Sequence, residues 1–305
     1  MRIVAEGLRF PEGPVALEDG SLLVVEVLGG RLSRVARDGT VSTVANLGGG
    51  PNGAAIGPDG RCYVCNNGGM DAVQHGDLLI PQEAPLDTLP GSIQAVDLAT
   101  GRFETLYAHT EATPFWGPND IVFDEAGGFW FTDFGRDRGR TRTRGAVYYA
   151  KIDGSAIREV IAPIDGPNGI GLSPDGRTLY VAMTYEGHLR AFALSGPGTL
   201  AQEEYGFDAG KILGRAGAGR YLDSLAVDGL GRICVASPGK GGILVFSPDG
   251  GEPSVVETPD PFTTNICFGG PDLRTAYVTL AATGRLVAFE WDAAGLALAH
   301  QIGRG

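Results

Sequence analysis

Short apolar runs alternate with polar turns along the whole chain, and six of these runs begin with copies of one phrase. The copies are PEGPVAL at Glu12, PNGAAIG at Asn52, PNDIVFD at Asn119, PNGIGLS at Asn168, LDSLAVD at Asp223 and TTNICFG at Thr264. In five copies an Asp-Gly, Gly-Gly or Gly-Arg turn then leads into an apolar run, and the sixth has one extra residue. Alternating β-branched and aromatic residues between turn signals predict strands. No stretch keeps a 3.6-residue period, so we expect little helix.

The spacing of the copies predicts the architecture. Successive polar positions are separated by 40, 67, 49, 55 and 41 residues. Such repeats indicate stacked or radially arranged sheets, and a four-stranded propeller blade needs about 40–45 residues. Since the repeat fills residues 1–305 without a linker, we expect one domain. RIVAEGL near the N-terminus, and GRLVAFEWD and LALAHQI near the C-terminus, are predicted to be strands, and pairing between the two ends would close a propeller ring.

The interval of 67 residues is too long for one blade and predicts an insertion. The best candidate is residues 66–90, NNGGMDAVQHGDLLIPQEAPLDTLP, which are polar and rich in Gly and Pro. Long segments of this kind are often functional lids over a site, although a plain surface loop fits equally well. The insertion is therefore a candidate lid over one end of the channel, and its His75 would be a candidate proton carrier.

Composition excludes several classes of function. The net charge of −12 argues against nucleic acid, whose affinity comes from Lys and Arg, and also against an anionic membrane surface. The first residues carry no secretory signal pattern, and no apolar run approaches the roughly 20 residues of a membrane span. We therefore expect a cytoplasmic protein. Cys62 and Cys65 are three residues apart, which places their side chains on opposite faces of a strand, and there is no second Cys pair, so we expect no zinc site there.

If the repeats are radial, the polar positions of the six copies converge on one axis. Glu12, Asn119, Asn168 and Asp223 would then offer two carboxylates and two amide carbonyls. Hard cations such as Ca²⁺ take six to eight such oxygen ligands at about 2.3–2.6 Å, and two carboxylates balance a divalent charge. A single PNG is an ordinary turn, but Glu, Asn and Asp replacing one another in register favour a cation site. We predict one divalent cation, Ca²⁺ first, with Zn²⁺, Mn²⁺ or Mg²⁺ as alternatives.

At these residues the chain resembles the family of senescence marker protein, gluconolactonase and drug-responsive lactonases, over essentially its whole length. The matching segments are PEGP, PNDIVFDEAGGFWFTDFG, GPNGIGLSPDGRTLYVAMT, LDSLAVDGLGRICVA and CFGGPDLRTAYVT. The resemblance implies an all-β fold, a six-bladed β-propeller, with a catalytic divalent cation in the central tunnel. By the same resemblance Glu12, Asn168 and Asp223 match metal ligands. Asn119 matches a metal- or substrate-binding residue, and Asp223 matches the proposed catalytic carboxylate.

One difference from this family bears on the substrate. Sugar-specific members carry an Arg two residues before the equivalent of Asn119, and here that position is Gly117. The loss of the guanidinium favours a less polar or aromatic lactone over gluconolactone. The residues expected to line the substrate pocket are Asn52, Phe115, Trp116, Asn119, Tyr185, Ser224 and Thr264.

The predicted activity is metal-dependent opening of a lactone to a hydroxy acid, with Asp223 as general base on a water or, alternatively, as nucleophile. The expected partner is the small lactone alone, and the oligomeric state is left open. Two other functions fit the same ligand set. One is a phosphotriesterase of the diisopropyl fluorophosphatase type, and the other is a calcium-binding propeller without catalysis. An active Asp223→Asn variant would contradict the assignment of the base.

A run of alternating arginines, GRDRGRTRTRG, is predicted to form an extended hairpin with its cations on one side. These are Arg136, Arg138, Arg140, Arg142 and Arg144. The hairpin would serve as an anion clamp, or as a solvated surface or subunit contact, and the second interpretation is favoured.

Overall fold

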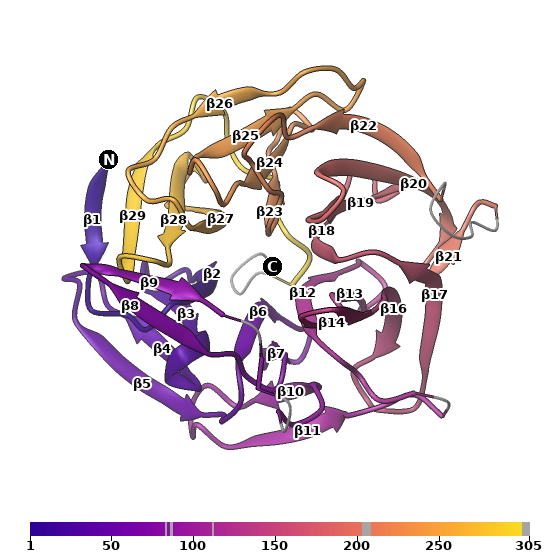
Figure 1. Ribbon diagram of the computed structural model, residues 1–305, viewed down its shortest axis with the longest axis horizontal. Helices are drawn as coiled ribbons and strands as arrows, with labels where there is room; N and C mark the ends of the chain where they lie inside the picture. Colours follow the sequence, from indigo (N-terminus) through magenta and orange to yellow (C-terminus); the bar gives the residue numbers. More distant parts are fainter. Residues whose placement is uncertain (83, 86–87, 112, 203–208, 301–305) are drawn as a thin grey trace.

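Six antiparallel sheets, five of four strands and one of five, stand around a central axis as the blades of a β-propeller (Figure 1). The structure, a computed structural model, describes residues 1–82, 84–85, 88–111, 113–202 and 209–300. Apart from one 3₁₀ turn, η1 (Val27–Gly29), the regular elements of these residues are strands. The predicted all-β, six-bladed fold with little helix is therefore confirmed.

Each blade is built from its innermost to its outermost strand in the same order. The innermost strands are β2 (Pro11–Ala16), β6 (Pro51–Ile56), β12 (Pro118–Phe123), β18 (Pro167–Leu172), β23 (Leu225–Val227) and β27 (Thr263–Gly269). The second strands are β3 (Leu22–Glu26), β7 (Cys62–Asn66), β13 (Gly128–Asp133), β19 (Thr178–Met183), β24 (Ile233–Ala236) and β28 (Thr275–Leu280). The third strands are β4 (Arg31–Val35), β10 (Ser92–Val96), β16 (Gly145–Lys151), β20 (His188–Gly196), β25 (Ile243–Phe246) and β29 (Arg285–Glu290). The outer strands are β5 (Val41–Asn46), β11 (Phe103–Tyr107), β17 (Ile157–Ile164), β22 (Lys211–Arg215), β26 (Ser254–Val256) and β1 (Arg2–Ala5), and β21 (Thr199–Leu200) adds to β20.

The ring is closed as predicted, because β1 pairs with β29 and supplies the outer strand of the last blade. The prediction of a strand in LALAHQI is wrong for residues 296–300, and residues 301 and 302 lie outside the described part. β1 already pairs with the outer edge of β29, the strand that this segment follows in the chain. The segment instead crosses the inner strands: Leu296 N–H donates to Val227 O at 3.0 Å, and His300 Nε2 lies 3.0 Å from Asp124 O.

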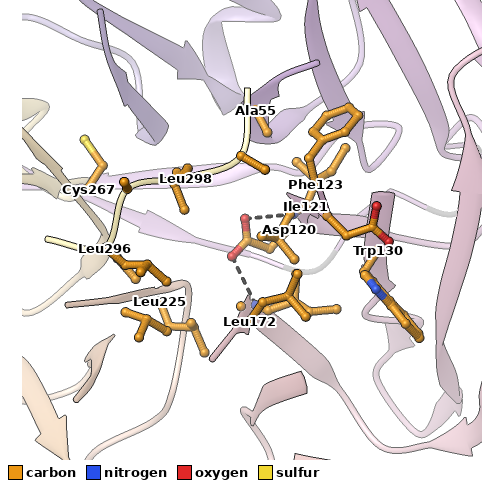
Figure 2. Close-up of a pocket in the computed structure, with 18 of the residues that line it drawn as sticks. Ala55, Asp120, Ile121, Phe123, Trp130, Leu172, Leu225, Cys267, Leu296 and Leu298 are labelled. Atoms are coloured by element: carbon orange, nitrogen blue, oxygen red, sulfur yellow. Dashed lines mark hydrogen bonds between the residues drawn. The ribbon is translucent and has the colours of Figure 1, made fainter. Parts of the chain in front are cut away.

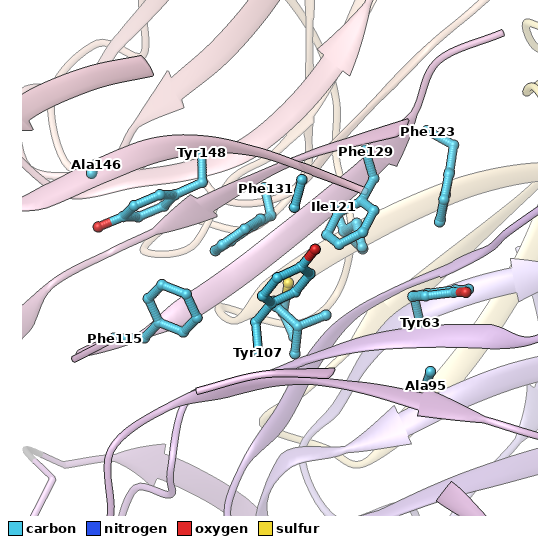
Figure 3. Close-up of a cluster of buried hydrophobic side chains, with 13 residues drawn as sticks. Tyr63, Ala95, Tyr107, Phe115, Ile121, Phe123, Phe129, Phe131, Ala146 and Tyr148 are labelled. Atoms are coloured by element: carbon cyan, nitrogen blue, oxygen red, sulfur yellow. The ribbon is translucent and has the colours of Figure 1, made fainter. Parts of the chain in front are cut away.

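The core lies between neighbouring blades, where the inward faces of adjacent sheets meet. Figure 3 shows the aromatic cluster between the second and third blades, with the rings of Tyr63, Phe115, Phe129, Phe131 and Tyr148. The ring centroids of Phe115 and Phe131 are 5.4 Å apart, and those of Phe131 and Tyr148 are 5.0 Å apart. Buried aromatic pairs at these separations stabilise the contact between blades beyond the area they bury.

The repeated phrase lies at the inner edge of each blade. The phrase is itself the innermost strand, and the apolar run after it is the second strand. In five inner strands the pairing register shifts within or just after the first three residues, as between Glu12 and Val15. A bulge of this kind re-aims side chains and is common beside active sites.

The predicted insertion is present between β7 and β10, except that residues 83, 86 and 87 lie outside the described part. It contains a two-stranded hairpin, β8 (Ala72–His75) with β9 (Leu78–Pro81). His75 is exposed at the end of β8.

The arginine-rich segment forms the predicted hairpin, β14 (Arg136–Arg138) with β15 (Thr141–Thr143). Its register contradicts the prediction that all five cations share one side. Arg136 pairs with Thr143, whereas Arg142 pairs with Asp137 on the opposite face, because crossing the turn changes the phase of the alternation.

Candidate functional site

The polar positions of the six copies lie close together because the inner strands touch one another around the axis. Ser224 N–H donates to Thr264 O at 3.2 Å, and the Thr264 hydroxyl donates to Pro11 O at 3.2 Å. Glycines allow equally close approach elsewhere: a Cβ on Gly53 would lie 2.4 Å from Asn119 O, and a Cβ on Gly169 would lie 2.5 Å from Asp223 O. The predicted convergence is thus observed at the level of the backbone.

Three amide oxygens at this convergence are buried and without a hydrogen-bond donor. They are the Oδ1 atoms of Asn52, Asn119 and Asn168. Buried polar atoms in proteins are nearly always paired, so orphaned oxygens that gather in one place indicate a missing donor or ion. No three His, Cys, Asp or Glu side chains are grouped as a metal site within the described ranges. The donor set is therefore a mixture of amide and carboxylate oxygens, which fits a hard cation.

Two carboxylates, Glu12 and Asp223, complete this set. Burial raises the pKa of Glu12 well above its usual value, and the neighbouring Asp223 charge raises it further. Burial also raises the pKa of Asp223 to about 7, and the hydrogen bonds from Asn168 and from the backbone of Ser224 oppose this increase. Like charges that are desolvated together favour protons or a cation between them. The residues present therefore fit a divalent cation.

Sequence reasoning missed two residues, Asp120 and Asn265, which occupy the third position of the phrase. Asp120 is buried and accepts N–H bonds from Ile121 at 2.9 Å and from Ile170 at 3.3 Å, and burial raises its pKa to about 7. The Asn265 amide donates to Glu12 Oε2 at 2.9 Å. The signal was present, since the other copies carry Gly or Ser there, but only the bulge turns this position toward the axis.

The expected pocket residues divide into three groups. Trp116 and Tyr185 are partly exposed. The guanidinium carbon of Arg138 lies 5.6 Å from the Trp116 ring centroid, and that of Arg142 lies 3.8 Å from the Tyr185 ring centroid. Asn52, Asn119, Ser224 and Thr264 are buried at the convergence. Phe115 is a correction: it is 0% exposed in the aromatic core, because its side chain packs on Phe131 and Tyr148 and cannot reach a substrate.

A hollow occupies the end of the channel opposite the cation ligands. This cavity of about 680 Å³ is lined by the ends of all six inner strands, and Leu296–Ala299 lie along it. Figure 2 shows its apolar walls, with Leu172, Leu225 and Leu298 around the Asp120 carboxylate. Among the expected site residues none lines this cavity. Asp120 therefore lies between the oxygen-rich end of the channel and an apolar end.

Comparison with known proteins agrees with the fold. Lactonase drp35 of Staphylococcus haemolyticus is 31% identical over 253 residues, which cover 82% of this chain and 70% of the relative. A gluconolactonase of Xanthomonas campestris superposes with a TM-score of 0.73 at 22% identity, covering 94% of this chain and 88% of that chain. The calcium-binding protein regucalcin of Agrobacterium tumefaciens superposes with a TM-score of 0.75 at 21% identity, covering 97% of this chain and 94% of that chain.

No helix among the described residues is long and apolar enough to span a bilayer.

Residues 10–282 match the sequence pattern of the SMP-30/gluconolactonase/LRE-like region, which is nearly the whole propeller. By this match and by its kinship to the lactonases, the chain belongs to the SMP-30/gluconolactonase/LRE-like family.

Proposed function

We propose that this protein is a divalent-metal-dependent lactonase that opens a cyclic ester to a hydroxy acid. The observation that supports this proposal most strongly is the group of three orphaned amide oxygens beside two carboxylates whose pKa values are raised. Glu12, Asn119, Asn168 and Asp223 would hold the cation, with Asn52 and Ser224 beside it. The curated relatives named lactonase supply the reaction class.

The residues of the chain have distinct roles in this reaction. Asp223 accepts a proton from water as the water attacks the lactone carbonyl, and returns that proton to the ring oxygen as the C–O bond breaks. Burial raises its pKa in the metal-free protein, and a bound cation would oppose that increase. A bound divalent cation would add positive charge beside the carbonyl oxygen, where negative charge develops. Glu12 and the asparagines would hold that cation in place.

The mouth of the site favours a flat, weakly polar substrate. Gly117, which precedes Pro118 and Asn119, places no cation next to the site. The ring centroids of Phe134 and Tyr185 are 5.0 Å apart. Gly166, which lies two residues before Asn168, is packed against the Tyr185 ring, because a Cβ there would be 2.4 Å from it. An aryl lactone would stack on these rings in competition with Arg138 and Arg142, whose guanidinium carbons lie 5.6 and 3.8 Å from the Trp116 and Tyr185 ring centroids.

The test is lactone hydrolysis by metal-stripped protein, with Ca²⁺, Mn²⁺, Mg²⁺ or Zn²⁺ restored singly and a panel of sugar and aromatic lactones. We expect turnover only with metal, and a loss of about 10²–10⁴-fold in Asp223→Asn, which is the usual contribution of a general base. Asp249→Asn, an exposed aspartate in a turn, is the matched control and should keep full activity. Metal binding is measured in parallel by calorimetry.

Two outcomes would redirect the proposal. Tight metal binding with hydrolysis of an organophosphate but of no lactone would indicate a phosphotriesterase. Tight binding without turnover of any ester would indicate a metal-binding propeller without catalysis. Full activity of Asp223→Asn would remove this residue from the role of base while leaving the lactonase itself in place.

A further inference from the structure

Arg136 holds both legs of the insertion at once. Its guanidinium donates to Asn67 O at 2.8 Å, where the insertion leaves β7, and to Thr88 O at 3.1 Å and Leu89 O at 3.2 Å, where it returns. The side chain is buried, with 5% of the residue exposed. A planar guanidinium can serve several acceptors in fixed directions, which a lysine cannot. Arg136 is therefore built into the base of the insertion and differs from the exposed Arg140 of the same hairpin.

The far end of the insertion is attached to a different blade. Leu79 N–H donates to Ala282 O at 2.9 Å, between β28 and β29. Met70 and Leu79 pack against a small apolar cluster that contains Phe10, Val27 and Ala281. In Figure 1 the β8–β9 hairpin lies over the first blade and reaches toward the last. The insertion thus spans from the second blade across the first to the sixth.

This path lies at the end of the channel that carries the cation ligands. β7 ends at Asn66, which pairs with Pro51 beside Asn52, and the apolar cluster contains Phe10, two residues before Glu12. On the other side, Asp133 accepts N–H bonds from Trp116 and Gly117, each at 2.8 Å, in the loop that leads to Asn119. Arg136 follows Asp133 by three residues, so one short connection fixes both this loop and the insertion.

We propose that Arg136 is a positioning residue that fixes the insertion as one wall of the substrate entrance and thereby sets the size of lactone that the enzyme accepts. The size selection rests on the proposed lactonase function, whereas the attachment of the insertion does not. Without the guanidinium, three part-buried backbone carbonyls lose their donor, and the contact between the two legs at the base of the insertion is weakened. The wall would then move away from the mouth without any change in the cation ligands.

The experiment compares Arg136→Met, Arg136→Lys and the matched control Arg140→Met. Hydrogen exchange is followed in peptides of residues 66–82 and 88–91, and steady-state kinetics are measured with a one-ring and a two-ring aromatic lactone. In Arg136→Met we expect at least tenfold faster exchange in the insertion. We also expect a change of at least fivefold in the ratio of the two KM values, with kcat for the smaller lactone and the Ca²⁺ affinity within twofold. Arg136→Lys should be intermediate, and Arg140→Met unchanged.

Unchanged exchange in Arg136→Met, or a KM ratio equal to that of the wild type, would overturn the proposal. If Arg136→Met does not fold, the same measurements on Arg136→Lys decide the question, because lysine keeps the positive charge and loses the planar guanidinium with its several donors. If the wild type hydrolyses no lactone, the lactonase proposal fails on its own, and the exchange measurement still decides whether Arg136 holds the insertion.

Discussion

The side-chain amide of Asn265 donates a hydrogen bond to Glu12 Oε2 at 2.9 Å, across 253 residues of sequence. Glu12 lies on the first inner strand and Asn265 on the last, so this contact closes the ring at its axis as β1 and β29 close it at the rim. Glu12 Oε2 also accepts the N–H of Gly13 at 2.9 Å. These two donors leave the other carboxylate oxygen, Oε1, for a cation.

Asn265→Ala is expected to weaken cation binding by about 10–100-fold, the usual effect of losing a partner that orients a metal ligand. The loss should be seen by calorimetric titration with Ca²⁺. The exposed Asn46→Ala is the matched control and should bind as the wild type does. Equal affinities in the two variants would show that Glu12 needs no orientation from Asn265.

The metal-free protein should lose stability as the pH rises from about 5 to 8. The folded-state pKa of Asp223 and of Asp120 is raised to about 7, and that of Glu12 is raised well above its usual value. When the pKa of a carboxyl is higher in the folded than in the unfolded protein, its contribution to stability is fully present at pH values below the unfolded-state pKa, near 4. That contribution is lost as the pH rises through the folded-state pKa. For Asp223 alone the loss between pH 5 and 7 is on the order of 2–3 kcal/mol.

Saturating Ca²⁺ should restore that stability, and by more at pH 8 than at pH 5, because the cation takes the place of the protons. A ligand at 100 times its Kd adds about 2.7 kcal/mol. The measurement is thermal unfolding at several pH values, with EDTA and with Ca²⁺. A metal-free Tm that rises between pH 5 and 8 would contradict the buried carboxylate cluster.

Phe115 and Trp116 are adjacent in sequence but should behave oppositely when replaced by alanine. Phe115→Ala should cost about 3–5 kcal/mol in urea unfolding, since the ring is fully buried. Its kcat/KM per folded molecule should stay near that of the wild type. Trp116→Ala should cost less than about 2 kcal/mol and should mainly raise KM for aromatic lactones. The reverse pattern would place Phe115 at the substrate.

Gly169→Ala should disturb the cation site, because the added Cβ would lie 2.5 Å from Asp223 O and 2.8 Å from Leu225 N. Backbone on both sides leaves no flexible neighbour to move, so we expect a loss of about 1–3 kcal/mol and weaker Ca²⁺ binding. Gly196→Ala is the control: a Cβ there meets nothing within 4 Å, and the change should stay within about 0.5 kcal/mol. Unfolding and titration of both variants decide the question.

The sequence by itself determined the number of blades and the position of the repeat that lies nearest the axis. Six co-registered copies with Glu12, Asn168 and Asp223 at one position identify the repeat, because a blade is a local unit whose strands are neighbours in the chain. Ring closure was equally predictable, since an unpaired strand before the first copy needs an edge, and β29 offers one.

Only the tertiary structure decided how side chains at adjacent positions divide between core and site. Phe115 is core and Trp116 is not, because packing between blades, rather than alternation along one strand, decides which ring is covered. Asp120 and Asn265 reach the axis through a register shift that needs the neighbouring strand. The contacts of Arg136 with Asn67 and Leu89 likewise join segments 69 and 47 residues apart, and no local pattern encodes that distance.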